Sequence, residues 1–429
     1  MIRRPPRSTL SSSSAASDVY KRQENMKVSI DEVLKSDKIC EASICYSGDL
    51  SSKSEKKYTL DYYIKMAEKL EKMGVHFLAI KDMAGLCKPK AAKILFKELK
   101  KNIKIPIHFH THDTSGNGVA ALLNASEAGV DIVDVAIDSW SGFTSQPSFG
   151  ALVESLDGNQ RDPKISSAVV RTAANYWEGV RKQYQPFESK VRTSMSEVYL
   201  HQMPGGQYTN LREQARSMGI TDERWPELAS MYAEVNKIFG DVIKVTPISK
   251  VVGDMAIYML ANNIQISDVL DPKKDVGFPA SVIEFFSGRL GQPYKGFPKV
   301  LQKKILNGKK PISYRFGSKL PSLNINGRTK DLERKYKDKI SEKDTLSQIF
   351  FPEVFDEYMK HKQQFGNTSV IPTSNYFFGM NTGEEIYVSI EPGKTLIIRY
   401  FTLSEPNEKG LSLIHISEPT RPERIAYSV

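Results

Sequence analysis

The most chemically suggestive stretch of this sequence is HFHTHD, residues 108–113. Residues two apart in a strand face the same side, so His110 and His112 can converge on one ion. Imidazole is a good ligand for zinc, manganese or cobalt, and the carboxyl ends of parallel strands commonly carry such sites. The plain alternative is two polar residues at a strand end. His108 shares the parity of the pair but lies deeper, which favours a core histidine over a ligand.

Lys81 is the second candidate, because it ends another apolar run, LAIKDMAG. Burying an unpaired ammonium group is costly, so this lysine needs a partner. It could bond to Asp82 or to a carboxylate of a neighbouring strand. Alternatively, it reaches the same cavity mouth as the two histidines. There a lysine with a lowered pKa could be carbamylated and become an anionic metal ligand.

Thr246 stands in the segment VIKVTPISKVVGDM. A threonine followed by proline at the start of an amphipathic helix is a common N-cap arrangement. From the residues alone, the N-cap is the favoured interpretation.

These candidates lie on a repeating pattern of apolar runs and helices that begins near residue 40. One helix is predicted from an N-cap at Thr59 to Gly74, the next begins near Pro89, and a third closes at Gly129. The runs rich in Val, Ile, Leu and Ala indicate parallel strands covered by helices. They read EASICYSGD, VHFLAIKDM, IPIHFHTHD and VDIVDVAID.

Four such units fit either an open doubly wound sheet or part of a (β/α)8 barrel. No G-x-G-x-x-G dinucleotide fingerprint follows any of these strands, so the barrel is favoured. We therefore predict an α/β fold, the C-terminal part of a (β/α)8 TIM-type barrel, then a helical extension and the start of a small strand-containing domain. The predicted helices of the extension are 166–184, 209–219, 226–239, 249–262 and 279–290.

The rest of the chain has a different character. The polar, lysine-rich stretch 308–345 is typical of a linker or an irregular excursion. SNYFFGM and EIYVSIEPGKTLIIRYFTL alternate like strands around the turn signals NTGE and EPGK. The expected parts are a non-native or disordered end (1–23), a partial TIM-type barrel (24–160), a last barrel strand with the helical extension (161–307), a linker and interdomain region (308–411), and a non-native end (412–429).

The two ends are compositionally foreign to the body. Residues 1–23 are rich in Arg, Ser and Pro and superficially fit a mitochondrial transit peptide. We favour another interpretation: this stretch and the terminal SLIHISEPTRPE resemble translated sequencing-adapter read-through. Both ends are expected not to belong to the native protein.

Composition excludes several classes of protein. With 40% hydrophobic and 26% charged residues, the chain is typical of a globular protein, and no apolar run is long enough to span a membrane. The net charge of +10 is interleaved with carboxylates, and part of it lies in residues 1–23, so it is no nucleic-acid footprint. Three cysteines without C-x-x-C spacing favour a reducing compartment, cytoplasm or mitochondrial matrix, over secretion.

Taken together, several long segments resemble the carboxyltransferase part of the pyruvate carboxylase family. The resemblance runs from about residue 40 to 410, with segments far more specific than any single short motif. The segments are IKDMAGLCKPKAA, HFHTHDTSGNG, SGFTSQPS, MPGGQYTNL, FGDVIKVTPISKVVGDMA and SNYFFGMNTGEEI.

The resemblance implies a role for each candidate residue. The lysine of IKDMAG, Lys81, would be carbamylated and bind a divalent metal such as Mn or Zn together with His110 and His112. Thr246 would shuttle a proton between the methyl group of pyruvate and biotin. Ser249 and Lys250 resemble residues that line the biotin pocket. The implied reaction is carboxyl transfer from carboxybiotin to pyruvate, giving oxaloacetate.

The resemblance also implies partners. Biotin would arrive on a carboxyl carrier domain that is absent here, charged by an ATP-dependent biotin carboxylase domain, in a full-length homotetramer. The family's metal-binding aspartate and substrate-binding arginine stand in an R-D-x-H segment that this chain lacks, so the chain alone is expected to be inactive. No nucleic-acid or membrane partner is expected.

Three alternatives stay open at this level. One is the alpha-type subunit of an oxaloacetate decarboxylase or transcarboxylase, which would share the barrel and metal site. A second is an aldol-type lyase or synthase with an H-x-H metal pair, although such enzymes need no carbamylated lysine. The third is a non-enzymatic assembly surface within residues 310–410.

Overall fold

A computed structural model describes residues 24–188, 193–403, 414–419 and 424–428. These residues fall into two compact units, which divide between Leu320 and Pro321. None of the helices in this part of the chain is long and apolar enough to cross a membrane.

The first unit contains a parallel sheet whose four strands follow one another in chain order. In a doubly wound sheet the order of the strands reverses at a switch point. Strands that follow one another in chain order are instead typical of a barrel wall. The barrel interpretation is therefore confirmed over its doubly wound alternative. The strands are β1 Glu41–Cys45, β2 Phe77–Asp82, β3 Ile107–Thr111 and β4 Ile132–Val133.

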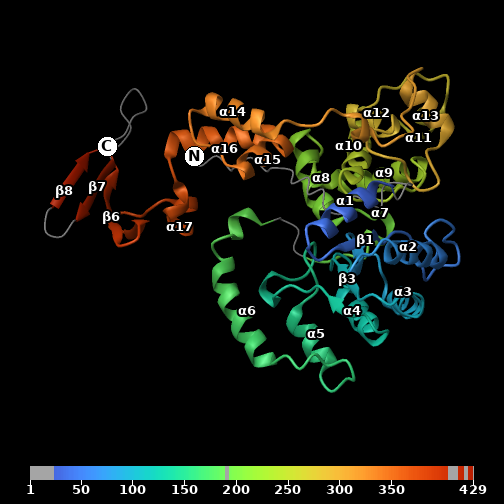
Figure 1. The fold of residues 1–429 in the computed structure, drawn as a ribbon, viewed down its shortest axis with the longest axis horizontal. Helices are drawn as coiled ribbons and strands as arrows, with labels where there is room; N and C mark the ends of the chain where they lie inside the picture. The colour runs from blue at the N-terminus through green and yellow to red at the C-terminus, as the bar shows by residue number, and fades with distance from the viewer. Residues whose placement is uncertain (1–23, 189–192, 404–413, 420–423, 429) are drawn as a thin grey trace. The chain divides into compact units, whose positions relative to one another are not determined.

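Helices cover one face of this sheet and leave the chemical residues on the other. Phe109 of β3 is buried, and its ring centroid lies 4.7 Å from that of Phe96 in α3. Because side chains alternate along a strand, His108 and His110 point to the opposite face. The helices on the covered face are α2 Leu60–Lys72, α3 Pro89–Asn102 and α4 Gly118–Glu127, preceded in the chain by α1 Glu24–Lys35. Figure 1 labels strands β1 and β3 near helices α2, α3 and α4.

The start and stop signals of these helices behave as expected. Thr59 caps α2 by accepting a hydrogen bond from the Tyr62 amide. Gly74 has a positive φ of 85° just after that helix, and Gly129 has a φ of 101° after α4. Pro89 is the first residue of α3. The predicted helices at these positions are confirmed.

A helical extension completes the first unit. Its helices α9, α10 and α12 pack against one another and share the hydrophobic core of the sheet. The extension confirms the helices predicted after residue 160. Its members are α5 Phe149–Leu156, α6 Ser167–Arg181, α7 Val198–His201, α8 Gly205–Ser217, α9 Trp225–Ile238, α10 Ile248–Ala261, α11 Ile266–Leu270, α12 Ala280–Phe286 and α13 Lys299–Leu306.

One expected strand is absent from this region. Within residues 161–188 and 193–307 no strand is formed, although the last barrel strand was predicted there. The segment before α10 is instead held by side-chain contacts: the Val242 amide donates to Asn236 Oδ1, and Tyr58 donates to the Asp241 carbonyl. Without a hydrogen-bonded neighbour along its backbone, the segment does not become a strand.

The second unit is a helical cluster followed by an antiparallel sheet. Leu332, Tyr336, Ile340, Phe355 and Met359 form its small core. The sheet has the order β5-β6-β7-β8, and the EPGK turn joins its first two strands. The elements are α14 Ile325–Tyr336, α15 Glu342–Phe350, α16 Pro352–Phe365, α17 Thr373–Phe378, β5 Glu385–Glu391, β6 Lys394–Leu403, β7 Ile414–Pro419 and β8 Arg424–Ser428.

Two sequence predictions for this unit are wrong. The expected linker 308–345 contains α14 and the start of α15, because Asn324 caps the first helix and Ser341 with Asp344 forms a capping box on the second. SNYFFGM was predicted as a strand, but Ser374–Phe378 belongs to α17. In contrast, the predicted strand pair around EPGK is confirmed.

That the two ends are foreign to the native protein stays a prediction. Residues 1–23 lie outside the described residues. The prediction for 412–429 concerns the origin of the sequence rather than its conformation, and β7 and β8 do not decide it.

Replacing Phe96 with alanine tests the packing of α3 on the sheet. Phe96 is fully buried, so Phe96→Ala should lower the free energy of unfolding of the 429-residue chain by about 3–5 kcal/mol, measured by urea denaturation. The matched control is Val169→Ala, at a side chain 67% exposed, which should change it by less than about 0.5 kcal/mol. A loss for Phe96→Ala as small as that of the control would contradict the assignment of this ring to the core.

Candidate active site and metal centre

The face of the sheet opposite helices α2, α3 and α4 brings three of the predicted site residues together at its carboxyl end. Lys81 of β2 lies directly beside His110 of β3 in the strand register. His112 follows one residue after β3, and its Nε2 atom lies 3.4 Å from Nε2 of His110. The two histidines therefore converge as the strand parity predicted.

Each imidazole is oriented by a hydrogen bond on its far side. Nδ1 of His112 lies 2.6 Å from the Thr144 carbonyl oxygen, and Nδ1 of His110 lies 2.6 Å from Asp134 Oδ2. A carbonyl or carboxylate oxygen only accepts, so both Nδ1 atoms carry the hydrogen. Both Nε2 lone pairs are then available on the side where the rings meet.

Two lone pairs at this separation repel unless a cation lies between them. Zinc–imidazole bonds are about 2.0–2.1 Å long, so one ion could reach two nitrogens that are 3.4 Å apart. Burial, with smaller contributions from His110 and Lys81, lowers the pKa of His112 to about 4. His112 is thus neutral near pH 7, as a metal ligand must be. The donor set fits a divalent ion.

The interpretation of Lys81 as a partner of Asp82 is wrong. Asp82 is fully buried on the other face, where it accepts hydrogen bonds from the Leu86 and Cys87 amides and from the Thr111 hydroxyl. Among the residues that the structure describes, no hydrogen bond or ion pair engages the Lys81 ammonium group. No third His, Cys, Asp or Glu joins the two histidines in those residues either. Lys81 is the nearby side chain that could complete the set.

Two glycines allow the backbone to approach the histidines closely. A Cβ atom on Gly85 would clash with the His112 carbonyl oxygen. A Cβ atom on Gly205, the first residue of α8, would lie 3.2 Å from His112 Nδ1. The Gly205 amide donates to the Met83 carbonyl at 2.9 Å, which fixes α8 against the end of β2. The sequence patterns did not predict this contact.

His108 lies deeper, as predicted, and is not among the converging nitrogens. Its Nδ1 lies 2.9 Å from Glu41 Oε2, and its Nε2 lies 2.9 Å from Asp134 Oδ1. The contact with Asp134 is an ion pair rather than a well-aligned hydrogen bond. The two carboxylates, Asp134 first, raise the pKa of His108 to about 9. His108 therefore carries a positive charge at neutral pH.

Thr246 is not the helix cap that its sequence context favoured. α10 begins at Ile248 with Pro247 at the N-cap position, and Thr246 is exposed. In the described residues, no hydrogen bond involves the Thr246 hydroxyl. Ser249 is 1% exposed, and Lys250 is exposed and pairs with Asp254 at 2.7 Å. The threonine hydroxyl is thus available to a ligand.

No direct contact joins Thr246 to the histidine pair in the described residues, but two structural links connect their segments. The first is α8, which abuts His112 at Gly205 and packs Gln207 and Leu211 against Gly253 of α10. The second starts at β1, where the Tyr46 amide donates to the Lys81 carbonyl at 2.8 Å.

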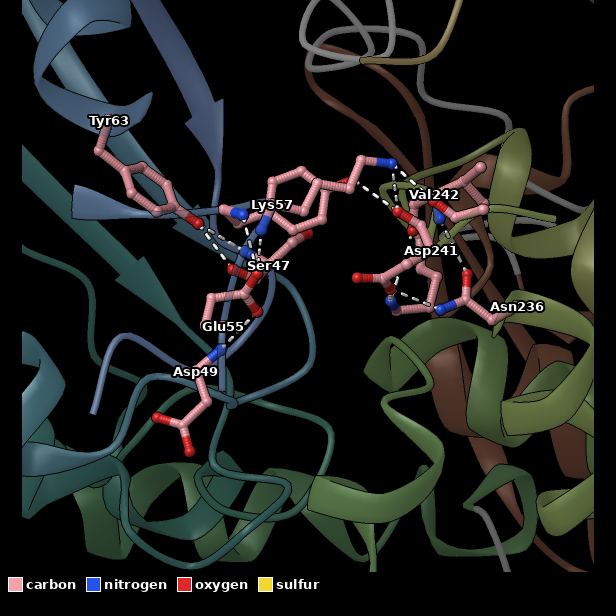
Figure 2. A network of polar contacts seen from close by, with 11 residues as sticks. Ser47, Asp49, Glu55, Lys57, Tyr63, Asn236, Asp241 and Val242 are labelled. Atoms are coloured by element: carbon pink, nitrogen blue, oxygen red, sulfur yellow. Dashed lines mark hydrogen bonds and ion pairs between the residues drawn. The ribbon is translucent and has the colours of Figure 1, made fainter. Parts of the chain in front are cut away.

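Figure 2 shows how the second link continues from the loop after β1 to the segment before Thr246. Lys57 Nζ donates to the carbonyls of Gly240 and Asp241, both at 2.7 Å. Asp241 Oδ1 in turn accepts from Asn236 at 2.9 Å. Glu55 closes the loop by accepting from the amides of Lys57 and Tyr58. This network anchors residues 240–242, four residues before Thr246.

Comparisons with known proteins show what this chain is similar to. The family profile described as "Conserved carboxylase domain" matches residues 198–399, and the profile "HMGL-like" matches residues 9–173. The pyruvate carboxylase of Bacillus subtilis is 45% identical over 400 residues, which are 93% of this chain and 35% of that protein. The mitochondrial pyruvate carboxylase of Rattus norvegicus is 41% identical over 87% of this chain and 32% of its own length. The chain therefore spans about a third of the curated relatives it matches.

The structural comparison agrees. The carboxyl transferase domain of Rhizobium etli pyruvate carboxylase superposes with a TM-score of 0.91 at 47% identity, covering 96% of this chain and 69% of that one. Structures of that same domain have been solved with pyruvate, and with oxamate and biotin.

Lys57 makes the anchor of Figure 2 dependent on pH. Burial first, with Lys244 and Lys295 also contributing, lowers the pKa of Lys57 from 10.5 to about 8. Between these pH values the unfolded chain binds more protons than the folded one, so stability should rise as pH increases from about 8 to 10.5. Lys57→Met should remove this part of the rise, measured by urea denaturation across that range.

The control for this experiment is Lys53→Met, at an exposed lysine of the same loop. It should keep the pH profile of the unmodified chain. Identical profiles for Lys57→Met and the unmodified chain would contradict the burial of this ammonium group.

Proposed function

Because this chain belongs to the pyruvate carboxylase family, we propose that it carries the site that transfers a carboxyl group from carboxybiotin to pyruvate, giving oxaloacetate. The observation that carries this proposal is the pair of imidazole Nε2 atoms that face each other at 3.4 Å beside Lys81. The related carboxyl transferase domain of Rhizobium etli has been solved with pyruvate, which makes pyruvate the substrate of choice here.

His110, His112 and a carbamylated Lys81 would hold a divalent metal such as Mn or Zn. When bound, the metal supplies a Lewis acid for the negative charge that develops on the pyruvate oxygen. A free ammonium group cannot bind a metal, so Lys81 would bind after its amine has added carbon dioxide. The resulting carbamate would be the anionic member of the ligand set.

Thr246 would relay a proton from the methyl group of pyruvate to the ureido nitrogen of biotin. The N–C bond of carboxybiotin breaks and releases carbon dioxide, and the ureido nitrogen takes the Thr246 hydroxyl proton. Thr246 Oγ1 takes a proton from the pyruvate methyl group in exchange, and that carbon forms the new bond to carbon dioxide. A threonine hydroxyl is too weakly acidic to act alone, so both transfers must be concerted. The exposed and unbonded hydroxyl of Thr246 supports this role.

Ser249 and Lys250 follow Thr246 in the first turn of α10 and would border the biotin pocket. Lys250 is exposed and can contact a ligand directly, whereas Ser249 is buried and would support the turn from beneath.

The partners of this site would be pyruvate, a biotin carboxyl carrier domain and the biotin carboxylase domain that charges it. The full-length assembly would be a homotetramer, with the region from 308 to 411 contributing to tetramer formation. The compartment would be the cytoplasm or the mitochondrial matrix.

Substitution of Thr246 tests the proton transfer. The assay is biocytin-dependent decarboxylation of oxaloacetate to pyruvate, measured with the longest polypeptide that its gene encodes. Thr246→Ala should lower the rate about 10²–10⁴-fold with little change in KM for oxaloacetate, because only the transfer step is lost. Thr246→Ser keeps the hydroxyl and should retain most of the rate.

Thr172→Ala, at an exposed threonine of α6, is the matched control and should keep full activity. Equal rates for Thr246→Ala and this control would exclude Thr246 as the proton carrier.

A further inference from the structure

Behind the histidine pair lies a row of charged side chains that the proposed reaction does not use. It runs from Glu41 of β1 through His108 of β3 to Asp134, just after β4, and ends on His110. Each contact is between 2.6 and 2.9 Å. The row therefore crosses the sheet from its first strand to its last and meets the site at one atom, His110 Nδ1.

We propose that Asp134 is a positioning residue that fixes the tautomer and orientation of His110, and that Glu41 and His108 hold Asp134 in place. This inference rests on the proposed function, because it assigns a purpose to His110 as a ligand.

Asp134 has the geometry that the role requires. Its two carboxylate oxygens face different rings: Oδ2 lies 2.6 Å from His110 Nδ1, and Oδ1 lies 2.9 Å from His108 Nε2. Two contacts from one planar group leave the carboxylate little rotational freedom. A carboxylate that accepts from the far nitrogen of a ligand histidine fixes the ring and raises its basicity.

The contacts of Asp134 agree with this role. It forms an ion pair with His108 and accepts a hydrogen bond from His110. The Asp134 side chain is still 39% exposed, so without His108 it could turn toward water. Glu41 contacts the other ring nitrogen of His108, Nδ1, and so holds the His108 ring in place beside Asp134.

The two ligand histidines are supported differently. His112 donates to a neutral backbone carbonyl, that of Thr144, whereas His110 donates to a carboxylate. Hydrogen bonds to an ionised acceptor are about twice as strong as neutral ones. Loss of Asp134 should therefore weaken His110 specifically and leave His112 in place.

The first test measures metal affinity of the 429-residue chain with Co²⁺, by titration of the cobalt absorption. Asp134→Ala should weaken Co²⁺ binding about 10–100-fold and change the ligand-field spectrum. Asp134→Asn, which keeps the volume but lacks the charge, should have a smaller effect. Glu41→Gln should have the smallest, because it acts through two intervening residues.

Asp131→Ala is the matched control. Asp131 lies three residues earlier, pairs with Lys100 at 2.9 Å and accepts from the Ile107 amide, with no contact to either ligand histidine. It should lower the free energy of unfolding about as much as Asp134→Ala does, and it should leave Co²⁺ affinity unchanged. If Asp134→Ala binds Co²⁺ as tightly as Asp131→Ala while His110→Ala binds weakly, the positioning role is wrong. If His110→Ala also binds normally, the proposed metal site fails and the inference with it.

A second test needs no metal. Long-range ¹H–¹⁵N spectra of the imidazole rings should show His110 with its hydrogen on Nδ1, and a mixture of tautomers in Asp134→Asn. An unchanged His110 tautomer in Asp134→Asn would overturn the proposal even if that variant loses affinity.

Discussion

The site depends on one constraint, which is that two imidazole nitrogens are held close together. Nε2 of His110 and Nε2 of His112 lie 3.4 Å apart, and each ring is held there by an acceptor on its other nitrogen. Neither ring can turn away without breaking that hydrogen bond. The surrounding structure serves this arrangement: β2 and β3 set the register, and α8 packs its glycine start against His112. The arrangement is repulsive when empty and favourable around a cation.

The segment that carries Thr246 is held in position by contacts from another loop. It forms no strand with the sheet, so backbone pairing does not fix its position. The loop after β1 does so through Lys57 and Tyr58, and that loop is itself tied to the Lys81 carbonyl by the Tyr46 amide. The loop after β1 is thus hydrogen-bonded at one end to the lysine proposed as a metal ligand, and at the other to the segment that leads to the threonine proposed as a proton carrier.

Much of this could be read from the sequence, because local rules governed it. Strand parity placed His110 and His112 together, and Pro89 and Gly129 marked helix ends. The predictions that were wrong involve choices that local patterns do not make. Thr246 was expected to cap α10, but that helix starts one residue later than a Thr cap requires. The stretch 308–345 looked like a linker because its helix α14 has a mostly polar surface.

Asp134, Thr144 and Asp82 were missed for a related reason. Each acts on a residue 24 to 32 positions away in the chain, and no sequence pattern announces a contact at that separation. These contacts depend on how neighbouring strands and loops pack, which only the three-dimensional structure shows.

The most direct test of the central claim is isotope exchange between ¹³C-labelled pyruvate and oxaloacetate, with biocytin present, in the longest polypeptide that the gene encodes. The site described here predicts exchange that requires biocytin, disappears when a chelator removes the metal, and returns with added Mn²⁺ or Zn²⁺. Exchange that proceeds without biocytin, or is absent with metal and biocytin both supplied, would contradict a carboxyltransferase site built on His110, His112 and Lys81.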